Sequence, residues 1–222
     1  SWPRPNHRRK GFHLTMKVLL IGSGGREHAL ATGLAADKAV TELHVAPGNP
    51  GIAEISQIHP LEINNNFEIV ALAKSLAIDL VVIGPEMPLV NGAADALREA
   101  GFAVFGPSKA AAQLEGSKHF AKGVMRDAGV PTAKSFTCES RSEIERALDE
   151  FGAPYVVKDD GLAAGKGVVV TKDREVALTH ALACKKVVIE EYLQGPEISL
   201  FGISDGKNIL AMQPAQDFKR AY

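Results

Sequence analysis

Short apolar segments recur along the first half of the sequence, and this repetition limits the possible fold more than any other feature. Each segment is followed by a turn rich in glycine or proline, and helical patterns of alanine and leucine lie between the segments. The expected strands are residues 17–21, 42–45, 79–83 and 103–105, and the expected helices end near residues 36, 76 and 100. Strands that alternate with helices in this way predict an α/β fold with a doubly wound parallel sheet.

Loops rich in turn-forming residues follow three of these strands, at residues 22–28, 46–51 and 84–90. We expect the second loop to be neither helix nor strand and the third to be a stiff loop with a polar tip. Open α/β sheets bind ligands at the carboxyl ends of their strands, so the three loops could line one pocket. The helix that starts within the first loop would favour an anion there.

The first loop lacks the glycine fingerprint of a dinucleotide site. The third glycine of that fingerprint would fall on Glu27, and the second strand ends in Ala46-Pro47 without an acidic residue to hold a ribose. A hydride-transfer enzyme is therefore disfavoured.

A domain boundary is expected near Pro131 to Ser135, where the alternating pattern gives way to an α+β arrangement. Before it, residues 109–129 are predicted to be helical, with a break at Gly116-Ser117 and Ser117 as the cap of a second helix. Beyond it, Ser142 to Glu145 predicts a capping box for a helix with an apolar face. That face would carry Ile144, Ala147, Leu148 and Phe151.

The remaining elements of the second half are predicted from apolar runs and turn signals. They are strands at 156–158, 168–170, 187–191, 197–204 and 207–212 and a helix near 173–182. Asp205-Gly206 is a strong hairpin signal between the last two strands.

A loop of small residues joins two apolar strands over residues 156–170. It contains Gly161, Gly165 and Gly167 with Lys158 before it and Lys166 within it. Glycine lets backbone N–H groups approach a phosphate closely, and lysine supplies the neutralising charge. The stretch does not match a Walker A loop, because Gly161 and Gly165 are too close together and a strand rather than a helix follows them. The stretch therefore predicts a lid over nucleotide phosphates, with an ordinary hairpin as the alternative.

Composition narrows the classes of partner and compartment. The 222 residues carry a formal net charge of -1, which gives no general attraction to nucleic acid or to an anionic membrane. No apolar run is long enough to span a bilayer. The two cysteines, Cys138 and Cys184, fit a reducing compartment, so we expect a cytoplasmic protein.

Several motifs, taken in order, resemble the ATP-grasp ligases and, within them, the N-terminal portion of the glycinamide ribonucleotide synthetase family. The motifs are Leu19 to Ala29, Ala46 to Gly51, Gly84-Pro85-Glu86, Leu114 to Lys118, Lys158 to Val168, Val187 to Leu193 with Glu197, and Gln216 to Arg220. The resemblance runs from about Met16 to Arg220, and the ordered set is far more specific than any one motif.

The resemblance implies a division of the chain. Residues 16–133 would form a Rossmann-like, pre-ATP-grasp βαβ domain for substrate, and residues 134–193 the lid subdomain of the ATP-grasp. Residues 194–222 would begin the central ATP-grasp subdomain, and residues 1–15 would be an extension or a cloning remnant. Because the family continues beyond this point, we expect the chain to be incomplete and inactive alone.

The activity that the resemblance implies is the ATP-driven joining of glycine to 5-phosphoribosylamine through a glycyl phosphate, with no protein nucleophile. Lys118 and Lys158 would contact ATP phosphates, Glu190 would accept from the adenine amino group, and Glu197 would hold the ribose. The implied ATP-binding residues are Lys118, Lys158, Gly161, Gly165, Lys166, Gly167, Glu190, Glu191, Leu193 and Glu197.

The resemblance also assigns residues to glycine and phosphoribosylamine. They are Gly24, Gly25, Arg26, Glu27, His28, Pro47, Gly48, Asn49, Glu86, Asp217, Lys219 and Arg220. For Glu86 and His28 a structural role is an equally weighted alternative. Mg²⁺ or Mn²⁺ would bridge the phosphates, with its ligands beyond Tyr222 rather than within this chain. We expect a monomer that binds neither nucleic acid nor membrane.

Two departures from the family pattern stand out. Asp159 takes the place of the usual alanine after Lys158, which would weaken nucleotide binding slightly, and the connection at 183–186 is short. Two other functions remain open: another ATP-grasp enzyme of the carboxylase type, and a nucleotide-binding module without catalysis.

Overall fold

The computed structural model describes residues 15–162 and 167–216, which fall into two compact units. Of the described residues, the first unit contains 15–131, 159–162 and Gly167. The second unit contains 132–158 and 168–216. No helix among the described residues has the length and apolarity needed to cross a membrane.

The first unit is built on a five-stranded sheet in the order β3-β2-β1-β4-β5, in which all strands run parallel. The strands are β1 (Met16–Gly22), β2 (Val40–Pro47), β3 (Gln57–Ile58), β4 (Leu80–Ile83) and β5 (Ala103–Phe105). This confirms the predicted doubly wound parallel sheet. The two residues of β3 were not predicted, because so short an edge strand shows no period in the sequence.

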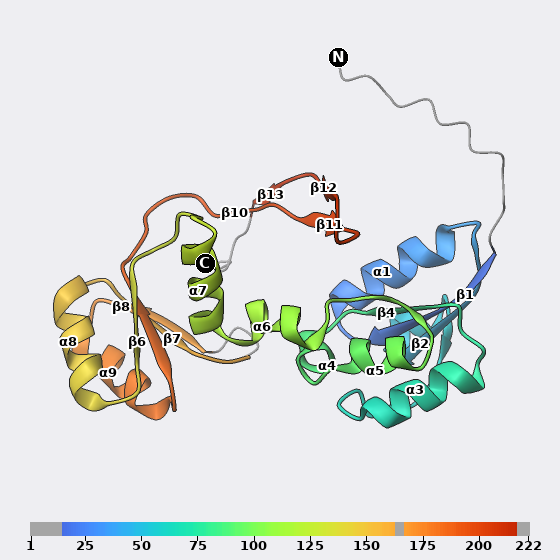
Figure 1. Cartoon of the computed structure of the whole chain (residues 1–222), viewed down its shortest axis with the longest axis horizontal. Helices are drawn as coiled ribbons and strands as arrows, with labels where there is room; N and C mark the ends of the chain where they lie inside the picture. Colours follow the sequence, from blue (N-terminus) through green and yellow to red (C-terminus); the bar gives the residue numbers. More distant parts are fainter. Residues whose placement is uncertain (1–14, 163–166, 217–222) are drawn as a thin grey trace, which may run out of the picture. The chain divides into compact units, whose positions relative to one another are not determined.

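Helices cover both faces of this sheet, with α1 on one face and α3 and α5 on the other (Figure 1). The helices are α1 (Gly25–Ala36), α2 (Pro50–Ala53), α3 (Asn66–Ser75), α4 (Glu86–Val90), α5 (Ala93–Glu99), α6 (Lys109–Gly116) and α7 (Lys118–Asp127). Val18 and Leu20 of β1 face a core with α1 and α2, whereas Leu19 and Ile21 face a core with α3 and α5. The predicted break at Gly116-Ser117 is confirmed, since Ser117 caps α7.

Two predicted loops contain regular structure, which corrects the sequence analysis. Ala46 and Pro47 extend β2 because they pair with Ile21 and Gly22 of β1. Residues 50–53 then form α2, since the Asn49 side chain accepts from the Ile52 amide and a proline starts the helix. The expected loop at 84–90 likewise contains α4, which starts at Glu86 behind a proline cap.

The second unit places a four-stranded sheet, in the order β6-β9-β7-β8, against two helices. The elements are β6 (Ser135–Cys138), α8 (Arg141–Phe151), β7 (Tyr155–Asp159), β8 (Val168–Thr171), α9 (Arg174–Ala183) and β9 (Val187–Glu190). Val157 and Ile189 point into a core formed with α8 and α9, and Leu148 of α8 is fully buried there. The predicted apolar face of α8 is therefore confirmed, as is the strand–loop–strand pattern of β7 and β8.

Beyond β9 the chain forms two small antiparallel pairs, β10 (Ile198–Ser199) with β13 (Ala215–Gln216) and β11 (Gly202–Ser204) with β12 (Ile209–Ala211). The hairpin predicted at Asp205-Gly206 is confirmed between β11 and β12. The single strand predicted at 197–204 is wrong, because Ile198–Ser199 and Gly202–Ser204 pair with different partners.

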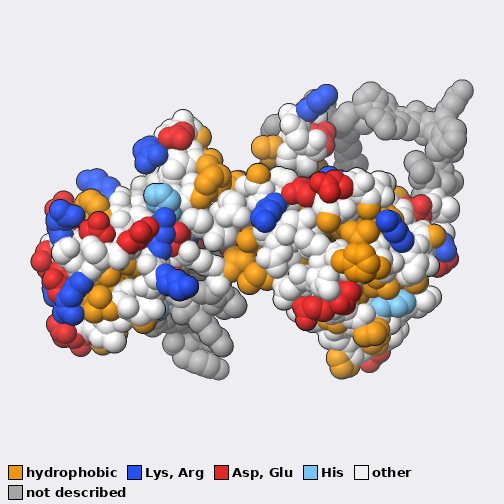
Figure 2. All heavy atoms as spheres, turned by 60° about the horizontal axis from the view of Figure 1, so that its bottom comes forward, with side chains coloured by type: hydrophobic (Ala, Val, Ile, Leu, Met, Phe, Trp, Pro, Cys, Tyr) orange, Lys and Arg blue, Asp and Glu red, His pale blue; other side chains and the backbone are white. Residues whose placement is uncertain are grey.

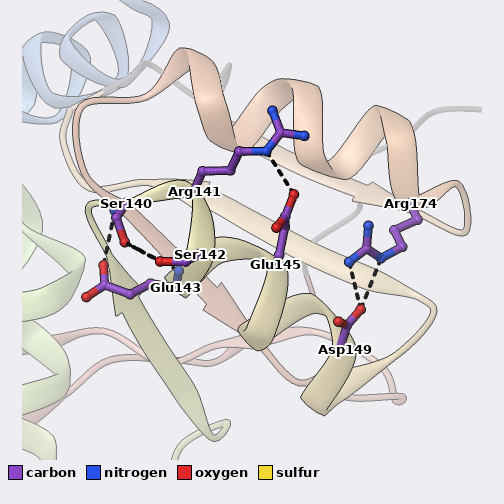
Figure 3. Close-up of polar contacts among 7 residues, drawn as sticks. All are labelled: Ser140, Arg141, Ser142, Glu143, Glu145, Asp149 and Arg174. Carbon is purple, nitrogen blue, oxygen red and sulfur yellow. Dashed lines mark hydrogen bonds and ion pairs between the residues drawn. The ribbon is translucent and has the colours of Figure 1, made fainter.

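The capping box of α8 lies two residues earlier than the sequence suggested (Figure 3). The Ser140 hydroxyl accepts from the Glu143 amide at 3.4 Å, and the Glu143 carboxylate accepts from the Ser140 amide at 3.0 Å. Glu145, which the sequence assigned to the box, instead binds Arg141 one turn earlier at 2.8 Å. Ser140 to Glu143 and Ser142 to Glu145 both fit the Ser-x-x-Glu pattern, and the helix begins where Ser140 is the cap.

We expect Ser140→Ala to lower the free energy of unfolding by about 1 kcal/mol, the usual loss when a serine N-cap is removed. Ser142→Ala should lower it much less, because Ser142 lies inside the first turn and makes only a side-chain contact with Ser140. Urea unfolding followed by circular dichroism measures both. A larger loss for Ser142→Ala would restore the register predicted from sequence.

Candidate functional site

The carboxyl ends of β1, β2 and β4 meet at one edge of the first unit's sheet, at the point where the strand order reverses. At such a switch point open α/β sheets bind ligands in a crevice outside the strand ends, which these loops would line. The loops predicted to share a pocket are the ones that leave this edge.

Glu27 is a buried carboxylate, 4% exposed, that holds two of these loops together. It accepts from the Gly24 amide at 2.8 Å, which caps the start of α1. A Cβ added at Gly22 or at Gly84 would overlap the Glu27 side chain, so both glycines are needed for its close packing. Glu27, which stands where the dinucleotide fingerprint has its third glycine, thus has a structural role. The sequence analysis considered this position only in relation to ligands.

Arg26 and Glu86 form an ion pair across the ends of β1 and β4, with 2.9 Å between Nη1 and Oε1. The hydrogen bond from Arg26 lowers the pKa of the Glu86 carboxyl, and the same bond raises the pKa of Arg26. Both groups therefore keep their charges near neutral pH, and both are partly exposed. The pair offers one cation and one anion to a polar ligand in the crevice.

The second loop is attached to the first by its backbone and by Asn49. The Gly48 amide donates to the Gly22 carbonyl at 3.1 Å, and the Asn49 amide group donates to the Ser23 carbonyl at 2.9 Å. Gly51 lies against the His28 ring so closely that an added Cβ would overlap it. The structure therefore brings together the predicted substrate residues at 24–28, 47–49 and 86.

We expect Gly84→Ala to destabilise the protein by about 1 to 3 kcal/mol, because the new methyl group would lie 2.5 Å from Cγ of the buried Glu27. Gly25→Ala is the matched control, since the space around Gly25 is open and alanine suits the first turn of α1. Chemical unfolding of both variants measures the difference. Equal stability of the two would show that Glu27 moves aside readily.

The second unit carries an open pocket on the face of its sheet opposite α8 and α9. Val156, Val168 and Val170 form an apolar floor, and the segment 191–197 after β9 forms a wall. The pocket has a volume of about 470 Å³. A sheet face that keeps valines exposed beside two charged residues suits a ligand with a flat apolar part and a polar part.

Lys158 of β7 and Glu190 of β9 are the charged residues of this pocket, and their side chains form an ion pair at 2.8 Å. The Lys158 side chain is 28% exposed, whereas that of Glu190 is 7% exposed. A buried carboxylate requires a partner, and the Lys158 ammonium supplies it while the lysine side chain also lines the pocket. The two residues predicted from sequence for ATP are therefore neighbours.

Other predicted ATP residues fall into three groups. Glu191, Leu193 and Glu197 line the pocket, and Glu191 also accepts from the Lys134 amide at 2.8 Å, which ties the residue after β9 to the residue before β6. Lys118 and Gly161 meet in the first unit, with Nζ donating to the Gly161 carbonyl at 3.0 Å. The Gly167 carbonyl accepts from the Asp159 amide at 2.7 Å.

Some predicted site residues lie outside the described residues, namely Gly165, Lys166, Asp217, Lys219 and Arg220. Within the described ranges, no three His, Cys, Asp or Glu side chains gather as ligands for a metal ion. Acidic and basic side chains are interspersed over the second unit on the face shown in Figure 2. That face therefore offers no large patch of one charge sign to attract an anion from a distance.

Two family models match the chain in sequence order. Residues 16–115 match the N domain of phosphoribosylglycinamide synthetase, and residues 116–222 match the ATP-grasp (A) domain of the same enzyme.

Curated relatives agree with these matches. The chain is 62% identical over 206 residues to a phosphoribosylamine–glycine ligase of Streptomyces coelicolor, and 55% identical over 214 residues to one of Mycobacterium leprae. The first alignment covers 93% of this chain and 50% of the relative, and the second covers 92% and 51%. The chain thus spans about half the length of the curated relatives it matches.

Solved structures show the same relation. The crystal structure of phosphoribosylamine–glycine ligase from Thermotoga maritima superposes with a TM-score of 0.75 at 32% identity, over 92% of this chain and 51% of that one. An ADP complex of N5-carboxyaminoimidazole ribonucleotide synthetase superposes with a TM-score of 0.72 over 94% of this chain and 56% of that one. Its identity is only 21%, so that likeness concerns the fold alone.

Proposed function

Since the chain belongs to the phosphoribosylglycinamide synthetase family, we propose that the protein joins glycine to 5-phosphoribosylamine with ATP, giving glycinamide ribonucleotide, ADP and phosphate. The observation that carries this proposal is the match of both family domains in order over residues 16–222. The two sites, one at a sheet edge and one on a sheet face, are chemically suited to it.

The reaction needs activation of a carboxylate followed by attack of an amine. The glycine carboxylate oxygen attacks the γ-phosphorus of ATP, so that ADP leaves and a glycyl phosphate forms. The amine nitrogen of phosphoribosylamine then attacks the glycyl carbonyl carbon, the C–O bond to phosphate breaks, and the nitrogen loses a proton. Such chemistry depends on positioning and on charge neutralisation rather than on a protein nucleophile.

ATP is the ligand we propose for the pocket of the second unit. The valine floor would pack against the adenine ring, and the backbone after β9 would offer hydrogen bonds to its edge. Glu190 would accept from the adenine amino group, Glu197 would hold the ribose hydroxyls, and Lys158 would contact a phosphate. Because Lys158 and Glu190 already form an ion pair, one rigid unit would recognise base and phosphate together.

The crevice of the first unit is the place we propose for phosphoribosylamine and glycine. Arg26 would bind an anionic group such as the 5-phosphate, assisted by the N-terminus of α1. Glu86, held ionised by Arg26, would accept from hydroxyl or amine groups. Asn49 and Gly48 would shape the opposite side of the crevice.

Divalent cations supply charge neutralisation on polyphosphates when they are bound. Among the described residues no three His, Cys, Asp or Glu side chains gather as ligands for one, and ligands for Mg²⁺ are predicted to lie beyond Tyr222. We place the reaction in the cytoplasm, which agrees with a content of only two cysteines in 222 residues. A monomeric state remains a prediction.

The test of this function is glycine-dependent release of ADP by the full-length protein in the presence of phosphoribosylamine, ATP and Mg²⁺. We expect ADP to form only when both co-substrates are present, with glycinamide ribonucleotide detected by mass spectrometry. ADP release that does not depend on glycine would favour another ATP-grasp enzyme. Nucleotide binding without ADP release under any condition would favour a non-catalytic module.

We expect Lys158→Ala to weaken ATP binding by about 10- to 100-fold, the range for loss of one charge-assisted hydrogen bond. Isothermal titration of the full-length protein measures the dissociation constant. Lys172→Ala is the control, since Lys172 is an exposed lysine at the end of β8 that does not line the pocket. In the double variant Lys158→Ala/Glu190→Gln, no buried carboxylate is left without its lysine partner. Unchanged ATP binding in both Lys158 variants would exclude the proposed contact between Lys158 and a phosphate.

A further inference from the structure

Asp160 was not predicted from the sequence to bind a ligand, and it does not line the pocket of the second unit. Its side chain nevertheless makes several polar contacts with a distant part of the sequence. Its carboxylate accepts from the Ser117 hydroxyl, with both oxygens at 3.2 Å, and from the His119 amide at 2.8 Å. These partners lie 43 and 41 residues away in sequence and belong to the first turn of α7. The contact therefore fixes the residues after β7 against the start of α7.

A second contact runs parallel to the first. The Lys118 ammonium donates to the carbonyl of Gly161, the residue after Asp160, at 3.0 Å. Two consecutive residues of one segment thus bind three consecutive residues, 117–119, of the other. A single stray hydrogen bond would not produce this matched arrangement.

The chemistry of the α7 terminus explains why a carboxylate is suited to this place. The N-terminus of a helix carries a partial positive charge, and Lys118, at the first helical position, adds a full one. Lysine is unfavourable there unless an anion offsets it, and Asp160 is that anion. Ser117 completes the arrangement, because its hydroxyl donates to Asp160 while it accepts from the Phe120 amide at 3.1 Å.

We propose that Asp160 is a positioning residue that holds Lys118 ready for the phosphates of the nucleotide. This inference rests on the proposed function and on the predicted role of Lys118 as a contact of the ATP phosphates. A lysine side chain loses considerable rotamer freedom when it binds, and affinity improves when that order exists beforehand. An ammonium has three donors, so it can hold the Gly161 carbonyl and a phosphate oxygen at the same time. Asp160 acts through Lys118 and does not itself touch the nucleotide.

The experiment uses the full-length protein and compares Asp160→Ala, Asp160→Asn and Asp127→Ala. Asp127 is the matched control, because it is an exposed aspartate at the other end of the same helix. ADP titration gives the dissociation constant, and steady-state kinetics give kcat with the KM values for ATP and for glycine. Hydrogen exchange of the His119 amide reports directly on its bond to Asp160.

We expect Asp160→Ala to raise the ADP dissociation constant and the KM for ATP about tenfold, as for loss of one hydrogen bond to a charged group. The kcat at saturating ATP and the KM for glycine should stay within about twofold, since Asp160 acts only on nucleotide binding. Asp160→Asn should lie closer to wild type, because its amide oxygen can still accept from His119. Asp127→Ala should match wild type.

Two results would overturn the proposal. One is ADP affinity unchanged in Asp160→Ala although His119 exchange is faster, which would make the contact a helix cap and nothing more. The other is a parallel change in kcat, both KM values and the melting temperature, which would indicate general loss of structure. Failure of the proposed function would be seen separately, because the wild-type protein would then release ADP without depending on glycine. The ADP titration would still decide the role of Asp160.

Discussion

Burial of β1 on both faces is the constraint on which the first unit depends. Residues 18–21 are fully buried, with alternate side chains in two different cores, so this strand can only lie at the centre of the sheet. Its neighbours β2 and β4 run parallel to it, and all three deliver their following loops to one edge. The polar groups of the site are gathered there because the strands themselves have no room for them. Glu27 is buried among these loops only because glycines at 22 and 84 leave space for it.

In the second unit, the described helices α8 and α9 pack on one face of the sheet, and the pocket lies on the other face. Strand alternation sends Val157 and Ile189 into the helix-covered core, and sends Val156, Lys158 and Glu190 to the open face. Val168 and Val170 on this face are each 42% exposed, and exposed apolar side chains of this kind are tolerated where a ligand or another part of a chain covers them. The ion pair between Lys158 and Glu190 fixes the polar end of this apolar floor. A shift of one residue in the β7 register would move the lysine into the core, so the register and the site are selected together.

The sequence predicts most strands and long helices of this chain, because their apolar periods extend over a turn or more. It fails where a few residues decide the structure: β3 and α2 are too short to show a period, and Ser140 and Ser142 offer equivalent capping boxes. For the site, the sequence correctly brings together the three crevice loops through the geometry of parallel strands. It included Glu27 as a substrate residue but did not predict its buried structural role, and it did not identify Asp160, because these contacts join residues whose proximity only the tertiary fold creates.

Of the two proposed sites, the one in the first unit does more to distinguish this protein from others with the same fold. Under the proposed function, the pocket around Lys158 and Glu190 would serve any enzyme that uses ATP, so it would not by itself select an acceptor. Selection would come from groups that contact the acceptor, for which we propose Arg26, Glu86 and Asn49 in the first unit. Arg26 and Glu86 orient each other through their ion pair, and the Asn49 amide group donates to the Ser23 carbonyl of the first loop. Because each loop is held by a contact with another, a change of acceptor under the proposed function would require coordinated changes in all three loops.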